Sequence, residues 1–293
     1  MKNRTLATGK ITSASQLYLF MSMPALLWEF LFLCIPIISI VGISFLSTYD
    51  SFLPTLSNYF SLLSPVYFRI IARSTILAFV NAFLCLLFAY PVVYFLVFRI
   101  KRMKHILLFL LVLPFWTSLL VQAYAWFFVL EKNGLINMLL MKIGLISAPL
   151  HLLNTQLAIY LVMAYCYLPF MILPLYTALE KIDRRLIEAS LDLGAGPFQT
   201  FLRVTWPLSL TGIKTGFFLV FVPSFGEFVI PALLGGTKSF YIGSLIEQYF
   251  LVSRDIYTGA AFTCLAGLIL VLLAFMIHSY FNRLTSLSKR NTL

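Results

Sequence analysis

Charged residues are scarce in this chain. Only 11% of its 293 residues are Asp, Glu, Lys or Arg, and 61% are hydrophobic, whereas soluble domains carry about 25% charged residues. A water-soluble fold of this length has too little interior to bury so much apolar surface. The composition therefore excludes an ordinary soluble domain and indicates that lipid surrounds much of the chain.

Patterns for metal binding, redox chemistry and catalysis are also missing. The four cysteines lie singly inside apolar segments, without CxxC spacing and without a nearby cluster of His or carboxylate residues: Cys34, Cys85, Cys166 and Cys264. We expect them to be inert buried thiols. Because no pairing of a nucleophile with a base is visible either, we expect no metal site, no catalytic residue and no enzyme activity.

A phosphate-binding loop of the form GxxxxGK[ST] occurs nowhere in the sequence. The nearest string, Gly235-Gly236-Thr237-Lys238-Ser239, lacks the required glycine spacing. We therefore expect no cofactor and no ATPase site in this chain.

What the sequence has instead is long hydrophobic segments. About twenty apolar residues span a bilayer core, and six segments reach that length, at about residues 16–46, 70–98, 106–130, 155–179, 213–234 and 258–280. They must be helical, because backbone groups in lipid need partners within the segment. We predict an all-α integral membrane protein with about six transmembrane helices, and a shorter helix within 133–147 at the outer interface.

The 21 basic residues are grouped in short tracts between the apolar segments. This pattern is typical of topology signals and of contact with anionic lipid, not of nucleic-acid binding. Fifteen of them fall on one side of the predicted spans, in both terminal tails and in the links after the second and fourth spans. Because cytoplasmic loops carry the excess of Lys and Arg, both termini are predicted to be cytoplasmic.

The link at 180–213 is the longest connection predicted on that side. Mixed charges and apolar residues over 181–193 are typical of a short surface helix, and Gly194 follows as a C-cap in the left-handed conformation. Pro197 suits the first turn of a second helix, which we expect to end at Pro207. An apolar ridge on such an element suits docking into a groove of a soluble partner, or contact with the lipid surface.

The spacing within this link resembles the EAA loop of permease subunits in bacterial ABC importers, E-A-A, three residues, G, nine residues, I-x-L-P. Four residues match it in register: Glu188, Ala189, Gly194 and Pro207. Three residues depart from it: Ser190, Val204 and Trp206. The resemblance implies that the loop forms coupling helices in a cleft of a separate ATPase subunit, which binds ATP and Mg²⁺.

Three further stretches resemble permeases of spermidine/putrescine importers. They are LLFLLVLPFWTSLLVQAYAW at 107–126, LPFMILPLY at 168–176 and PSFGEFVIPALLGG at 223–236. The resemblance implies the MetI-like ABC importer permease fold, in the inner membrane of a bacterium. It also implies four partners besides the lipid bilayer: a homologous second permease, two copies of an ATPase subunit and an extracytoplasmic polyamine-binding protein.

We expect three regions along the chain. Residues 1–69 hold the N-terminal tail, the first span and an outer loop. Residues 70–281 form a five-helix permease core that contains the coupling loop 180–213, and residues 282–293 form a cytoplasmic tail.

Glu227 lies in a predicted span, where an ionised group costs about 2.5–3.5 kcal/mol at the bilayer centre. Nearby Pro223, Gly226 and Pro231 indicate a broken or kinked helix end, which is tolerated where it lines a cavity. A polyamine needs carboxylates for its charge and aromatic faces for its methylene and ammonium groups. Our hypothesis for the residues of the substrate passage is Glu227, Phe225, Phe228 and Trp116. The alternative is a structural hydrogen bond between Glu227 and the partner permease.

Two other functions remain open from the sequence. A sister permease for another small solute, such as an anion, is one, although an anion pathway would more naturally have basic residues within the spans, which have almost none. An ion-coupled secondary carrier is the other. It would show repeats with paired broken helices or a relay of ionisable residues, and no clear repeat is visible.

Overall fold

A computed structural model describes residues 21–46, 54–100, 102–236 and 240–290. The chain forms two compact units, Met1–Leu62 with Arg254–Leu265, and Leu63–Ser253 with Ala266–Leu293. The basic residues predicted for the N-terminal tail lie outside the described residues.

The first unit contains a helix over Met21–Ser44, which is long and apolar enough to span a membrane. Its later part consists of the π-helix η1 (Phe30–Cys34) and α2 (Ile35–Ser44). The short helix α3 (Ser57–Ser61) is fastened to its end by Asn58, whose Nδ2 donates to the Ser44 carbonyl at 3.1 Å. The unit also holds the beginning of α14 (Ile256–Arg290).

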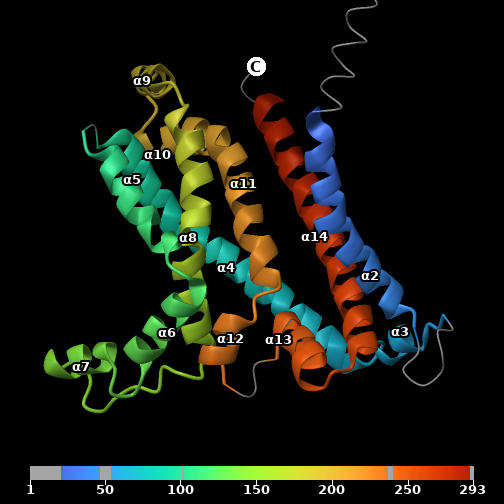
Figure 1. The fold of residues 1–293 in the computed structure, drawn as a ribbon. Coiled ribbons are helices and arrows are strands. Elements are labelled where there is room, and N and C mark those ends of the chain that lie inside the picture. Colours follow the sequence, from blue (N-terminus) through green and yellow to red (C-terminus); the bar gives the residue numbers. More distant parts are fainter. Residues whose placement is uncertain (1–20, 47–53, 101, 237–239, 291–293) are drawn as a thin grey trace, which may run out of the picture. The chain divides into compact units, whose positions relative to one another are not determined.

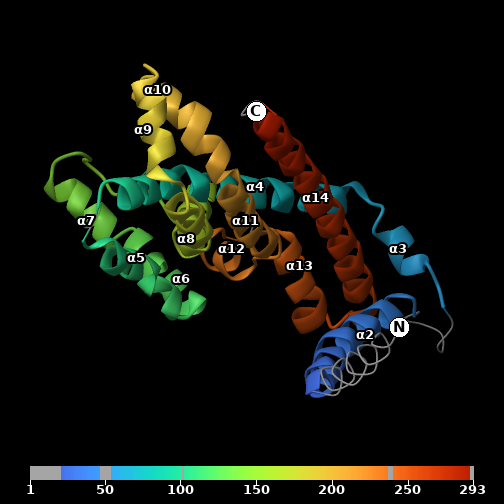
Figure 2. The ribbon, with the colours of Figure 1, turned by 90° about the horizontal axis from the view of Figure 1, so that it is seen from above.

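The core of the second unit consists of α4 (Pro65–Phe98), α8 (Gln156–Glu180) and α11 (Trp206–Phe225), each of which packs against the other two (Figures 1 and 2). Small residues allow close approach between them, as is usual in membranes. At Gly212, for example, a Cβ atom would lie 2.4 Å from Cβ of Ala178 on α8. This packing fixes the interior face of each spanning helix.

The third predicted span, 106–130, is not one continuous helix as expected. It consists of α5 (Lys104–Val112), the 3₁₀ turn η2 (Leu113–Trp116) and α6 (Leu119–Leu130). The segments on either side of the break meet at 93°. The proline and extended residues of the break leave carbonyl groups without helical partners. The Gln122 amide donates to the Thr117 carbonyl at 3.2 Å. It also donates at 2.6 Å to the Pro114 carbonyl, which accepts from the Thr117 N–H and hydroxyl as well.

The short apolar stretch predicted at 133–147 contains α7 (Leu135–Lys142). The turn before it is held by Asn137, which is fully buried. Its Nδ2 donates to the carbonyl groups of Glu131, Lys132 and Leu150 at 3.0–3.2 Å, so the connection from α6 to α8 is an ordered structure.

The fifth span begins earlier than predicted, because the helix that starts at Pro197 does not end at Pro207. It runs without interruption through α10 (Pro197–Thr200), the π-helix η3 (Phe201–Thr205) and α11. A proline inside an α-helix clashes with the carbonyl four residues earlier. The wider π-turns of η3 directly precede Pro207, and π-bulges are a common accommodation within helices.

Beyond α11 the chain breaks at residues 226–228 and resumes as α12 (Val229–Leu234), as the sequence around Glu227 predicted. The connection expected to be an outer loop then contains α13 (Ile242–Glu247) and the π-helix η4 (Gln248–Val252), which the sequence does not reveal. Its start is tied to α4, since the Ile242 N–H donates to Ser74 Oγ at 2.8 Å.

Five helices of the described chain are long and apolar enough to span a membrane, or six when the bent pair counts as one span. The prediction of an all-α membrane protein with about six spans is thus confirmed. Within the second unit, the start of α5, α9 (Arg184–Asp192) and α10 lie at one end, and α7, α12 and α13 lie at the other (Figure 1).

Candidate functional site

The loop between α8 and α11 folds as the predicted helix–glycine–helix element. Asp183 caps the start of α9, because its Oδ1 accepts a hydrogen bond from the Arg185 N–H at 3.0 Å. Gly194 ends it with a φ of +83°, and the Ala195 N–H donates back to the Ser190 carbonyl at 3.1 Å. This closure is a Schellman motif, which needs a residue that tolerates the left-handed region.

The motif residues of α9 face outward. Ala189 and Gly194 are exposed, and Ser190 and Glu188 lie beside them on the same short element. Around them the element has apolar side chains that are about half exposed or more: Leu186, Leu191, Leu193, Phe198 and Leu202. Leu193, next to the glycine, is 89% exposed. The element therefore presents an apolar surface with an acidic residue on it.

The departure from the EAA pattern at Ser190 has a structural reason. Ser190 Oγ lies 3.1 Å from Thr200 Oγ1, and Thr200 is buried. This hydrogen bond joins α9 to α10 across the glycine turn, a contact that alanine at position 190 would lack.

The departure at Trp206 is also explained by packing. Its ring lies against Tyr90 of α4, with ring centroids 5.2 Å apart, and Phe201 packs edge-on against the same tyrosine at 5.5 Å. The Tyr90 hydroxyl lies 3.0 Å from Ser209 Oγ. An aromatic cluster thus fixes the start of α11 on α4. Pro207 lies in the first turn of α11.

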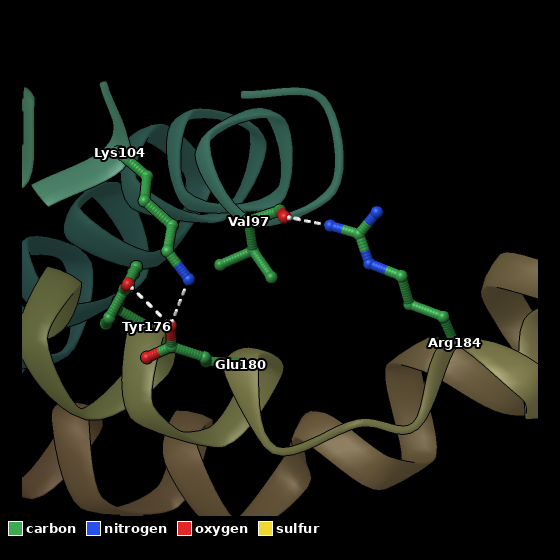
Figure 3. A network of polar contacts seen from close by, with 5 residues as sticks. All are labelled: Val97, Lys104, Tyr176, Glu180 and Arg184. Atoms are coloured by element: carbon green, nitrogen blue, oxygen red, sulfur yellow. Dashed lines mark hydrogen bonds and ion pairs between the residues drawn. The ribbon is translucent and has the colours of Figure 1, made fainter. Parts of the chain in front are cut away.

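Three hydrogen bonds lie near the base of α9 (Figure 3). Arg184 Nη2 donates to the Val97 carbonyl in the last turn of α4 at 3.0 Å. Lys104 Nζ donates to Glu180 Oε1 at 2.6 Å, and the Tyr176 hydroxyl donates to the same oxygen at 2.9 Å. From the sequence alone, these basic residues are only topology signals.

Glu227 lies in the break between α11 and α12 and is only 8% exposed. Its Oε2 accepts a hydrogen bond of 2.5 Å from the Tyr167 hydroxyl of α8. Its Oε1 accepts from the Val229 N–H at 2.9 Å and the Ile230 N–H at 3.4 Å, which are free donors in the first turn of α12. The carboxylate therefore caps α12 and joins it to α8.

The other three residues predicted for the passage differ in exposure and do not form one cluster with Glu227 in the described chain. Phe225 is buried in the last turn of α11, and Phe228 is 40% exposed. Trp116 is 76% exposed on the other broken span. No contact joins Trp116 to Glu227 in the described chain. Its neighbour Phe115 packs edge-on against Phe170, whose ring centroid is 6.0 Å from that of Tyr167.

Sequence reasoning missed the polar residues that surround the break. Asn81 Nδ2 of α4 donates to Ser224 Oγ of α11 at 2.8 Å, and both side chains are fully buried. Tyr167 supplies the partner of Glu227. A polar side chain within an apolar span is the signal that marks each of them, because such residues usually face the bundle interior.

Tyr241, just before α13, is buried as well. Burial raises the pKa of its phenol, an effect that Tyr160 reinforces and Arg73 opposes. The connection that leads into α13 is thus buried at Tyr241 and tied to α4 rather than solvated.

Residues 87–286 match the family described as binding-protein-dependent transport system inner membrane component. The spermidine/putrescine transport system permease protein PotB of Haemophilus influenzae is 38% identical over 255 residues, which cover 86% of this chain and 89% of that protein. PotB of Escherichia coli K12 is 39% identical over 252 residues, covering 83% and 92%.

Solved structures with the same fold come from a bacterial ABC transporter involved in the import of the acidic polysaccharide alginate. One matches with a TM-score of 0.71 at 18% identity, over 95% of this chain and 99% of that one. A second, from that transporter in complex with an alginate pentasaccharide-bound periplasmic protein, matches with a TM-score of 0.74 at 17% identity, over 94% and 97%. At these identities the match shows the fold. Together with the sequence relatives, it establishes that this multi-pass membrane chain belongs to the family of binding-protein-dependent transport system inner membrane components.

Proposed function

We propose that this chain is the permease subunit of a bacterial importer that moves polyamines such as spermidine and putrescine inward, driven by ATP hydrolysis on a separate subunit. One observation carries the proposal: the element formed by α9, Gly194 and α10 exposes apolar side chains, and its second helix, α10, continues as one helix into the spanning helix α11. Motion imposed on this element therefore reaches a membrane span directly.

The partners follow from that surface. Its exposed leucines and Phe198 suit a groove on an ATPase subunit, in the helix-in-groove mode, and Glu188 adds a charge that a basic side chain can pair with. The working complex has two ATPase copies, which bind ATP and Mg²⁺, and a second, homologous permease. An extracytoplasmic protein delivers the polyamine, and nucleic acid has no part in the complex.

The basic residues support a cytoplasmic location for the coupling element. The links that follow α4 and α8 carry Arg99, Arg102, Lys104, Lys181, Arg184 and Arg185, and they lie at the same end of the second unit as α9 (Figure 1). Because positive loops stay on the cytoplasmic side, this end faces the cytoplasm. The basic residues of the two terminal tails predict that the termini are cytoplasmic as well.

Glu227 and the relatives support a cationic substrate. Glu227 is the one buried charged residue in the described part of the chain, and the proteins named PotB are spermidine/putrescine permeases. We place Glu227, Phe225, Phe228 and Trp116 along the passage, where a carboxylate attracts ammonium groups and aromatic faces contact methylenes. Its hydrogen bonds to Tyr167 and α12 also give Glu227 a structural part, so the two roles need separate tests.

Reconstitution tests the proposal. The chain is purified with its ATPase, second permease and binding protein, placed in liposomes, and assayed for uptake of labelled spermidine with and without ATP. We expect uptake only with ATP, and loss of uptake in Glu188→Lys, whose charge is reversed on the docking surface. Uptake without a nucleotide-hydrolysing partner, or labelling of residues 180–213 from outside the cell, would refute the proposal.

Glu227→Gln tests the passage. Glutamine keeps an oxygen that accepts the α12 hydrogen bonds but removes the charge, so a passage role predicts reduced spermidine uptake at normal protein levels. Unchanged uptake at normal levels would leave Glu227 with its structural part alone.

A further inference from the structure

Two polar contacts lie near the base of α9: one joins α9 to α4, and the other joins α5 to α8. The first involves Arg184, the first residue of α9, whose guanidinium donates to the Val97 carbonyl at 3.0 Å. The last four carbonyl groups of a helix have no partner within it, and Val97 lies one residue before the end of α4. A cation is also favoured at this negative end of the helix dipole.

The second contact is an ion pair at the end of α8. Glu180 is the last residue of α8, and Lys104 is the first residue of α5. Their 2.6 Å contact is the one ion pair within the described residues, and the Tyr176 hydroxyl supports it from one turn earlier on α8. Figure 3 shows the two contacts side by side at the base of α9.

The linker between α8 and α9 is too short to act as a free hinge. It consists of Lys181, Ile182 and Asp183. The Ile182 side chain is buried, and its N–H donates to the Leu179 carbonyl at 3.2 Å. Asp183 is committed to the cap of α9. While the short linker holds α9 to α8 and Arg184 holds it to α4, displacement of α9 is passed to both helices.

We infer that Arg184 is a positioning residue that transmits displacement of α9 to the end of α4. The Lys104–Glu180 pair joins the start of α5 to the end of α8, so that these two ends move together. The inference rests on the proposed function, since it names the route by which the ATPase moves the spans. Because α4 packs against α8 and α11, a shift of its end reaches the whole core. The contacts are exposed or half-exposed, and exposed pairs contribute little to stability, so their loss affects coupling more than folding.

Arg185 provides a matched control. It is the next residue of α9, carries the same charge and is also exposed, yet its side chain makes no hydrogen bond or ion pair with the described residues. Arg184→Ala and Arg185→Ala therefore remove the same charge from the same turn, and only the first removes the contact with α4.

The test uses the complete complex in liposomes and measures ATP hydrolysis and spermidine uptake in parallel. Arg184→Ala should assemble with the ATPase and hydrolyse ATP, while the ATP consumed per spermidine transported rises about tenfold, within the usual range of coupling between sites. Arg184→Lys, which keeps a cationic donor, should restore much of the uptake, and Arg185→Ala should behave as the wild type. An equal ratio of ATP to spermidine in Arg184→Ala and Arg185→Ala would overturn the inference.

The ion pair provides a second, independent test in case Arg184→Ala fails to assemble. Lys104→Glu should raise the same ratio, and Lys104→Glu combined with Glu180→Lys should lower it again. A ratio that stays at the wild-type value in Lys104→Glu would overturn the inference. Failure of the wild-type complex to couple ATP to uptake would instead refute the proposed function, so the two failures are distinguishable.

Discussion

The Tyr167 hydroxyl donates a 2.5 Å hydrogen bond to Glu227, and thereby connects the middle of α8 to the break between α11 and α12. The other carboxylate oxygen accepts from two N–H groups of α12. The N–H groups of Val229 and Ile230, which have no helical partner because of the break, thus both donate to the Glu227 side chain. Such partners are the condition for irregular backbone at membrane depth.

Tyr167→Phe should lower the free energy of unfolding, because the buried carboxylate loses a partner and hydrogen bonds to charged groups contribute about 1.5–3 kcal/mol. Thermal unfolding of the purified protein in detergent measures the change. The control is Tyr165→Phe on the same helix, whose hydroxyl makes no hydrogen bond with the described residues. Equal midpoints for the two variants would contradict the structural part assigned to Glu227.

Gly194→Val should abolish ATP-driven uptake while leaving membrane insertion intact. Its φ of +83° places a β-branched side chain in the left-handed region, which costs roughly 1–2 kcal/mol and re-aims α9 relative to α10. Gly196→Val is the control, because Gly196 has a φ of −68° and a ψ of 162°, an extended conformation that suits any residue before proline. Comparable uptake by both variants would contradict the role of the glycine turn.

Gly243→Ala should displace the break beside α13. A Cβ atom there would lie 2.3 Å from the Gly226 carbonyl oxygen and 2.9 Å from Phe228 Cβ, and overpacking of this kind costs about 1–3 kcal/mol. Gly226→Ala, at the other residue of this contact, is the control. A Cβ atom added to Gly226 would have no neighbour within 4 Å, and the φ of Gly226 is negative. The unfolding midpoint should fall for the first variant only, and a fall of the same size in both would argue against this close approach.

Gln122→Leu should destabilise the break in the third span. Its amide donates to the carbonyl groups of Pro114 and Thr117. The Pro114 carbonyl keeps the Thr117 N–H and hydroxyl as donors, so the loss falls on the Thr117 carbonyl and on the link across the break, where a hydrogen bond contributes about 0.5–1.5 kcal/mol. The comparison is Gln248→Leu, whose side chain makes no hydrogen bond with the described residues. Unfolding midpoints in detergent decide between them. An unchanged midpoint in Gln122→Leu would mean that water or lipid headgroups satisfy these carbonyl groups instead.

Some features were predictable because they depend on neighbours in the sequence. The glycine turn at Gly194 follows from the helical pattern over 181–193, which ends at a glycine, and the break at Glu227 follows from the prolines and glycine around it. The continuity of α10 with α11 was not predictable, because a proline usually stops a helix and only the π-turns of η3 allow this one to continue. The break at Thr117 was missed because the segment is apolar on both sides of it, and hydrophobicity alone does not distinguish a bent span from a straight one.

The sequence by itself determined that this chain lies in lipid, which segments are apolar enough to cross it, and that a helix–glycine–helix element joins the fourth span to the fifth. These follow from hydrophobicity and backbone geometry, which act over short distances along the chain. Only the tertiary structure decided which polar groups meet. Tyr167 and Glu227 are 60 residues apart in the sequence, and Arg184 and Val97 are 87 apart. Such pairings depend on how spans pack side by side, and the order of residues within each span does not specify that packing.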